Sequence, residues 1–176
     1  MNTVAILMGL LSSLAAAAPV RAASESAPRP RGNRIIVLGD SLAVSPTHSD
    51  NFTVELQKRL DTLAPGWTIT NEGIRGDTTN GGLRRVERAL TPEARILILE
   101  LGANDGLRGV DVATVEKNLA SLIQRAQAKG IRVLLCGMET PPVRGWKYTV
   151  DFHGISPASR RDSTCRSCRF CCKGSR

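Results

Sequence analysis

The stretch "RIIVLGDSLAVSP", residues 34–46, gives the clearest indication of the fold. Residues 35–38 form an unbroken apolar run, which is typical of a strand buried on both faces of a parallel sheet. Gly39 permits a sharp turn after this run, and Asp40 and Ser41 follow at once. Ligands of open α/β sheets bind outside the carboxyl ends of the strands. The stretch therefore predicts a polar site at the end of a central strand.

Strand-like and helix-like segments alternate through the rest of the chain. Further strands are expected at 67–71, 95–101 and 131–136, and helices are expected where apolar residues recur at helical spacing, around 52–63, 83–90 and 115–126. Such alternation predicts an α/β fold with a doubly wound, flavodoxin-like parallel sheet, helices on both faces and right-handed crossovers. The chain is long enough for one domain, expected at residues 34–153.

The charge distribution argues against a nucleic-acid partner. The formal net charge is +8, but residues 1–153 hold 18 Lys and Arg against 15 Asp and Glu, whereas residues 154–176 hold 6 against 1. The excess is therefore concentrated in the tail, and the body has no basic stripe for a duplex. Three Phe, two Trp and one Tyr offer little for base stacking.

The N-terminal segment resembles a secretory signal. Residues 4–18 are apolar and uncharged, and small residues suited to cleavage follow up to Ala23. We expect residues 1–23 to be a signal peptide and residues 24–33 to be a flexible lead. The run is short for a stable membrane span, which favours a periplasmic or secreted protein. An uncleaved N-terminal anchor is the alternative.

Each of the first three strands leads into a loop with polar or glycine-rich chemistry. These loops are "GDSL" at 39–42, "GIRGDTT" at 73–79 and "GAND" at 102–105. A doubly wound sheet brings such loops to one edge. The hydroxyl of Ser41, a backbone N–H beside Gly76 and the amide of Asn104 can then meet, and together they supply a nucleophile and two oxyanion donors for acyl transfer.

The same loops carry a family resemblance. "GDSLAVSP", "NEGIRGDTT" and "LGANDGLRG" resemble the first three sequence blocks of the GDSL, or SGNH, hydrolases, in particular the secreted bacterial branch described as arylesterase, thioesterase I or lysophospholipase. The resemblance covers roughly residues 33–153. It implies that Ser41 is the nucleophile and that the Ser41 N–H, the Gly76 N–H and the Asn104 side chain form the oxyanion hole. It also implies small acyl ester, thioester or lysophospholipid substrates, with no metal or other cofactor.

Each candidate residue also has a structural interpretation. A serine after a strand is often a helix cap, and an asparagine in a glycine-rich loop often stabilises a turn. Asp40 is expected to support the site by bonding backbone N–H groups rather than to act as a base. Similar structural work is expected of Asp77 and Asp105.

The sequence offers no general base in the expected place. Members of the resembled family carry an Asp-x-x-His block near the C-terminus, and this chain contains no such motif. His48 is expected to face solvent. Asp151 and His153 have the wrong spacing and follow the segment "PPVRGWKY", which together with "GLRG" is expected to shape the substrate groove. The general acid and base are therefore unknown.

Residues 154–176 depart from the pattern of the domain. The tail contains four cysteines, Cys165, Cys168, Cys171 and Cys172, and no apolar periodicity. The cysteines could bind zinc, which would make the chain a zinc-binding interaction protein, or they could pair as disulfides. A third hypothesis is that the tail is read out of frame, because a shift by two nucleotides from Thr164 can encode an apolar strand. On that hypothesis the sheet is truncated at its C-terminal edge.

The missing general base predicts impaired catalysis. A serine hydroxyl is a weak nucleophile without a base. We therefore expect a serine esterase or thioesterase with little or no turnover in this chain. A non-catalytic remnant that still binds acyl ligands is the alternative.

Overall fold

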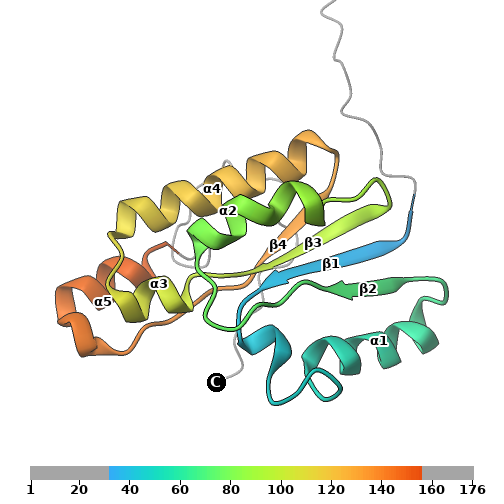
Figure 1. Cartoon of the computed structure of the whole chain (residues 1–176), viewed down its shortest axis with the longest axis horizontal. Helices are drawn as coiled ribbons and strands as arrows, with labels where there is room; N and C mark the ends of the chain where they lie inside the picture. The colour runs from blue at the N-terminus through green and yellow to red at the C-terminus, as the bar shows by residue number, and fades with distance from the viewer. Residues whose placement is uncertain (1–31, 156–176) are drawn as a thin grey trace, which may run out of the picture.

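The structure, a computed structural model, describes residues 32–155. These residues form a parallel sheet with helices packed against it (Figure 1). The predicted signal segment, the lead up to residue 31 and the tail from residue 156 lie outside the described residues. The elements are β1 (Arg34–Gly39), η1 (Leu42–Val44), α1 (Phe52–Leu63), β2 (Thr68–Asn71), α2 (Thr79–Ala89), β3 (Ala94–Glu100), α3 (Ala103–Arg108), α4 (Val112–Ala128), β4 (Arg132–Leu135), η2 (Pro142–Arg144) and α5 (Trp146–His153).

The four described strands form one parallel sheet in the order β2-β1-β3-β4. Val37 pairs with Asn71 of β2 on one side and with Ile98 of β3 on the other, and Ile98 pairs in turn with Leu134 of β4. The order reverses between β1 and β3, which is the switch point at which doubly wound sheets bind ligands. The predicted fold class is therefore confirmed.

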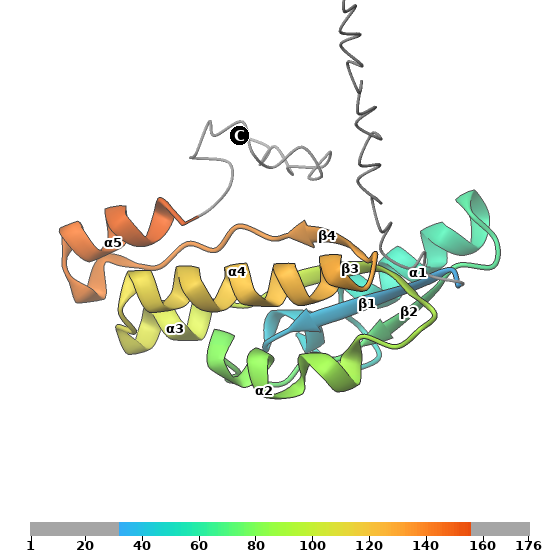
Figure 2. The same cartoon turned by 90° about the horizontal axis from the view of Figure 1, so that it is seen from above.

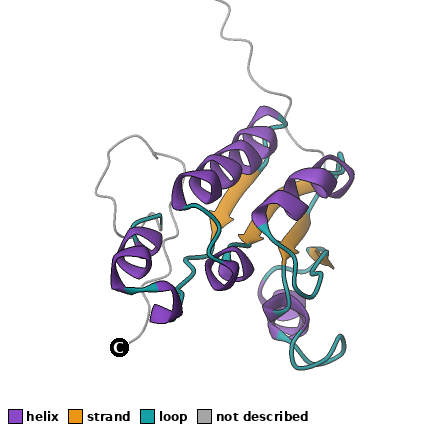
Figure 3. Cartoon of the chain, turned by 60° about the vertical axis from the view of Figure 1, so that its left-hand side comes forward, coloured by secondary structure: helices purple, strands orange, loops and turns teal. Residues whose placement is uncertain are grey.

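Helices cover both faces of the sheet (Figures 2 and 3). Side chains alternate along β1, so Ile36 and Leu38 join one apolar cluster beneath α2 and α4, while Ile35 and Val37 join a second cluster beneath α1. Both clusters are buried, which explains the continuous apolar run of β1.

Helix α1 forms where the sequence predicts it, but only part of its apolar stripe packs against the sheet. Leu56 and Leu60 pack against the sheet. Phe52 is 41% exposed and Leu63 is 81% exposed, so the ends of the stripe point away from the core. The spacing identified the helix correctly and overestimated the width of its buried face.

The sequence interpretation missed two helices and misplaced the start of a third. Helix α3 occupies part of the segment predicted as a loop, and α5 follows Gly145. Helix α2 begins at Thr79, not at residue 83, because the side chain of Thr78 accepts a hydrogen bond from the Gly81 N–H at 3.2 Å. Glycines in its first turn concealed this start, although Gly82 has a packing role, since a Cβ there would collide with Leu101.

Candidate active site

The turn that carries Ser41, the candidate nucleophile, connects β1 to η1. The Asp40 carboxylate accepts a hydrogen bond from the Leu42 N–H at 3.0 Å, as expected for a residue that holds the turn. Ser41 is the first residue outside η1, yet its side chain makes no capping hydrogen bond. Ser41 thus occupies the N-cap position of η1 without using its hydroxyl as a cap. Within residues 32–155 its hydroxyl has no hydrogen-bond partner and is available for other chemistry.

Asn104 meets this turn from α3. Its side-chain Nδ2 donates to Asp40 Oδ2 at 3.0 Å, across 64 residues of sequence. The chain reaches α3 through Gly102, whose φ of 127° lies in a region that glycine adopts readily. An amide nitrogen has two N–H groups, so one remains for a ligand. The structure thus places the Asn104 amide directly beside the Ser41 turn.

Gly76 lies at a tight turn in the second loop. The Asp77 N–H donates to the Ile74 carbonyl at 3.1 Å, and Gly76 has a φ of 74° at the third position of this turn. A residue with a Cβ is strained there. The Gly76 carbonyl accepts a hydrogen bond from Arg108 Nη2 of α3 at 2.9 Å. Its N–H has no acceptor in the part of the chain that the structure describes.

A buried arginine that the sequence interpretation missed joins two of the loops. Arg85 of α2 is 9% exposed, and its guanidinium donates to Asp77 at 2.8 Å, to the Glu72 carbonyl at 2.5 Å and to the Gly39 carbonyl at 2.9 Å. The ion pair with Asp77 keeps this buried cation neutralised. In the sequence, the burial of Arg85 is indicated only by its position one helical turn before Ala89, which is also buried in α2.

The third loop is fastened to α2 by a buried carboxylate. Asp105 accepts the Thr79 N–H at 2.8 Å and the Thr79 hydroxyl at 2.7 Å. The first N–H groups of a helix lack partners inside the helix, and a carboxylate there also complements the helix dipole. The structural roles expected of Asp77 and Asp105 are therefore confirmed by their contacts.

Glu100 packs against the start of the Ser41 turn, and the sequence gives no sign of this role. It is the last residue of β3 and only 5% exposed. Gly39 packs directly against it, since a Cβ at position 39 would lie 2.5 Å from Glu100 Oε2. Neither carboxyl oxygen makes a well-formed hydrogen bond to any described residue. The glycine of "GDSL" is thus required for close approach to this side chain.

Burial controls the ionisation of these two carboxyl groups. Loss of solvent raises the pKa of Glu100 to about 8, and the charge of Asp40 adds to the rise, while the backbone N–H groups of Asp40 and Ala43 partly offset it. Burial also raises the pKa of Asp40, opposed by its bonds to the Leu42 N–H and Asn104. Glu100 is therefore mostly neutral at pH 7, which avoids two adjacent buried negative charges.

Neither histidine is bonded to the candidate nucleophile. His48 is exposed, as expected. His153 Nε2 accepts a hydrogen bond from the Thr140 N–H at 3.3 Å. Since the Ser41 hydroxyl has no bond to either ring, no base is in place among residues 32–155. The same residues contain no group of three His, Cys, Asp or Glu side chains that could hold a metal ion.

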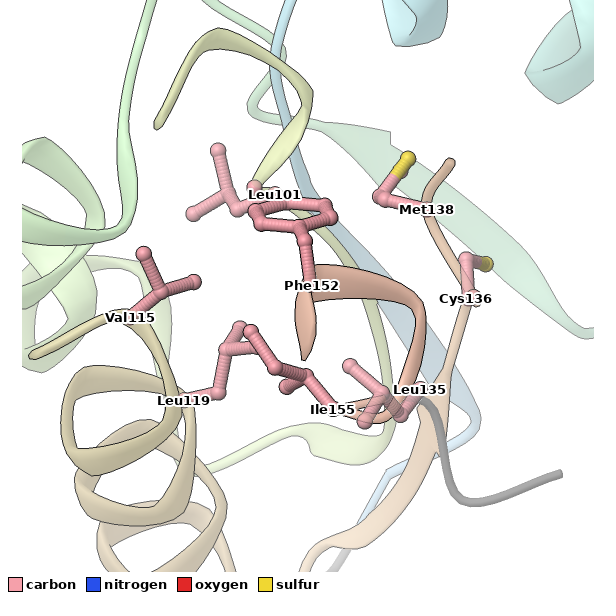
Figure 4. Close-up of a pocket in the computed structure, with 10 residues that line it drawn as sticks. Leu101, Val115, Leu119, Leu135, Cys136, Met138, Phe152 and Ile155 are labelled. Atoms are coloured by element: carbon pink, nitrogen blue, oxygen red, sulfur yellow. The ribbon is translucent and has the colours of Figure 1, made fainter. Parts of the chain in front are cut away.

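An apolar cavity lies near this edge between β4, α4 and α5 (Figure 4). Its volume is about 20 Å³, and it is lined mainly by Leu101, Val115, Leu119, Leu135, Met138 and Phe152. That space holds about one water molecule. The enclosed part of this hollow is therefore too small to hold an acyl chain.

Comparisons with known proteins agree with this arrangement. The model of the GDSL-like lipase/acylhydrolase family matches residues 37–159. The chain is 40% identical to esterase TesA of Pseudomonas aeruginosa over 69% of its own length and 62% of that protein's length. It is 33% identical to an arylesterase of Vibrio mimicus over 75% and 68% of the two lengths. The chain thus spans 62% and 68% of the lengths of these two curated relatives.

Solved structures show the same relationship. The esterase EstA of a Pseudoalteromonas species, inhibited by monoethylphosphonate, superposes with a TM-score of 0.65 at 32% identity, covering 70% of this chain and 69% of that one. AlinE4, an SGNH-hydrolase family esterase, gives 0.67 at 34% identity, covering 73% and 70%. Sequence match, strand order and the three converging loops lead to one conclusion: the chain belongs to the GDSL-like lipase/acylhydrolase family.

Proposed function

We propose that this protein carries the acyl-transfer site of a carboxylic ester or thioester hydrolase, with Ser41 as the nucleophile. The observation that carries the proposal is the Asn104–Asp40 hydrogen bond of 3.0 Å, which holds a side-chain amide beside the Ser41 turn. The N–H groups of Ser41 and Gly76 and the second N–H of Asn104 are the candidate oxyanion donors. Names of the relatives support esters and thioesters as the substrate class.

In the proposed reaction, Ser41 Oγ bonds to the carbonyl carbon of the substrate. The carbonyl π electrons move to oxygen, where the three N–H donors stabilise the negative charge. The Ser41 proton must pass to a base. As the carbonyl reforms, the bond from its carbon to the ester oxygen or thioester sulfur breaks, and the base gives the proton to the departing alcohol or thiol. Water then attacks the acyl carbon, the bond to Ser41 Oγ breaks, and the proton taken from water returns through the base to Ser41 as the acid leaves. Because no base contacts Ser41 among residues 32–155, we expect turnover close to background.

Hydrolysis of p-nitrophenyl acetate tests the expected impairment. Wild type and Ser41→Ala should release nitrophenol at nearly equal, slow rates. Removal of triad members in other serine hydrolases leaves only the small acceleration from oxyanion stabilisation and binding. A fast rate that Ser41→Ala abolishes would show that a base is present and would overturn this part of the proposal.

Added imidazole tests the nucleophile itself. An external base that enters the site should raise the wild-type rate above the imidazole background, and Ser41→Ala should show only that background. Mass spectrometry after treatment with a fluorophosphonate should place a slow adduct on Ser41. If neither the rate increment nor the adduct depends on Ser41, the proposed nucleophile is wrong.

Two finer expectations belong to the same proposal. The apolar N-terminal run supports export to the periplasm or beyond, and N-terminal sequencing of the protein from a periplasmic extract would show cleavage after Ala22 or Ala23. In residues 32–155 no helix has the length and apolar character needed to cross a membrane.

The zinc hypothesis rests on the cysteine tail, outside the described residues, and metal analysis of the purified chain tests it.

A further inference from the structure

Three arginines connect the loops that surround the candidate site. Each guanidinium reaches a neighbouring segment and donates to a main-chain carbonyl, so that η1, the second loop, α3 and η2 are joined in series. The contacts are Arg75 to the Val44 and Pro46 carbonyls at 3.4 and 3.3 Å, Arg108 to the Gly76 carbonyl at 2.9 Å, and Arg144 to the Leu107 carbonyl at 3.2 and 3.0 Å. The three side chains therefore occupy one continuous edge of the molecule.

The charge of these arginines is not neutralised. Arg75, Arg108 and Arg144 are exposed, and none has a carboxylate within 4.0 Å among the described residues. Arg85, in contrast, is buried against Asp77. Carbonyl contacts fix the position of a guanidinium and leave its positive charge and remaining donors for an anion.

Large apolar side chains are exposed on the same segments. Of the eight exposed large hydrophobic residues in the described chain, four lie on these segments, Leu42 (54%), Ile74 (46%), Leu107 (49%) and Val143 (67%), and Trp146 (73%) follows η2 at the start of α5. We call these five residues and the three arginines the arginine rim. Figure 1 shows α3 and α5, which carry part of it, together at one end of the molecule. Concentration of apolar surface at one edge indicates an interaction site.

We propose that the arginine rim docks the protein on the surface of an anionic phospholipid membrane. The arginines would pair with lipid phosphates, and the apolar side chains would enter the boundary between headgroups and acyl chains. Tryptophan is enriched at that depth of a bilayer, which suits the exposed Trp146 at the start of α5. This inference goes beyond the proposed function, since docking requires no turnover at Ser41.

Fluorescence of Trp146 provides a local test. The chain has two tryptophans, so Trp67→Phe leaves Trp146 as the single reporter in the full-length protein. Its emission should shift to the blue with vesicles of phosphatidylcholine and phosphatidylglycerol. It should stay unchanged with phosphatidylcholine alone. The local reporter matters because the basic tail could also bind anionic vesicles.

Charge variants test the electrostatic part. In the same background, Arg75→Gln together with Arg144→Gln should weaken vesicle binding about 30-fold, since each arginine near an anionic surface contributes about a factor of five. A matched control replaces Arg84 and Arg88, exposed on α2, with Gln. This control removes the same charge and should change binding little.

Three outcomes would overturn the proposal. Vesicle binding without a shift of Trp146 would place docking elsewhere, as on the tail. An equal shift with uncharged vesicles would remove the role of the arginines. An equal shift with a short-chain phosphatidylglycerol below its micelle concentration would identify a single lipid as the ligand, not a membrane surface.

Discussion

Replacing Glu100 with Gln should make the protein more stable at alkaline pH. Gln preserves the shape of the side chain and cannot ionise. The pKa of Glu100 is about 8 in the folded protein against 4.5 for an ordinary Glu. Between these pH values the folded state holds one more proton than the unfolded state, so the free energy of unfolding falls as pH rises. In Glu100→Gln the free energy of unfolding does not fall for this reason, because Gln has no proton to lose.

The size of the effect follows from the same two pKa values. One pH unit is worth about 1.4 kcal/mol, so the interval from 4.5 to about 8 sets a ceiling of about 5 kcal/mol. Effective dielectric constants inside proteins exceed those of a dry interior, which reduces such burial effects. We therefore expect Glu100→Gln to gain about 2 kcal/mol over wild type between pH 5 and pH 8.

Urea denaturation followed by circular dichroism at a series of pH values measures this difference. The advantage of Glu100→Gln should be near zero at pH 5, grow up to about pH 8 and then level off. Glu87→Gln is the control, because Glu87 is exposed and its bond to Lys129 lowers its pKa. A difference that stays constant from pH 5 to pH 8 would refute the argument that Glu100 is buried as a neutral acid.

Two further substitutions test how the loops are held together. Arg85→Gln should lower the free energy of unfolding by about 3 kcal/mol, because it removes one partner of a buried ion pair, whereas exposed Arg88→Gln should change it by less than about 0.5 kcal/mol. Urea denaturation at pH 7 compares them, and equal losses would contradict the burial of Arg85. Asn104→Asp should destabilise the protein by about 2 kcal/mol at pH 7 by facing Asp40 with a second carboxyl group. That loss should shrink as pH falls and one carboxyl group takes a proton, and a loss that does not change with pH would argue against this contact.

From the sequence alone, the alternation of strands and helices and the sheet edge of the candidate site could be predicted. The apolar run of β1 identified a doubly buried strand, and the rule for parallel strands brought the loops of Ser41, Gly76 and Asn104 to one edge. These inferences succeed because they need only local periodicity and a fixed handedness of connection. Short helices such as α3 escaped them, because six residues contain too few turns to show a period.

Which side chains hold the candidate site together became clear only from the folded chain. Arg85 reaches the Gly39 carbonyl across 46 residues, and Asp105 reaches Thr79 across 26. Periodicity reports which face of an element is buried, but it carries no information about the partner that lies opposite. Glu100 shows the same limit, since its pKa is raised by burial and by the charge of Asp40, and Gly39 and Asp40 are distant in sequence and adjacent to it only after folding.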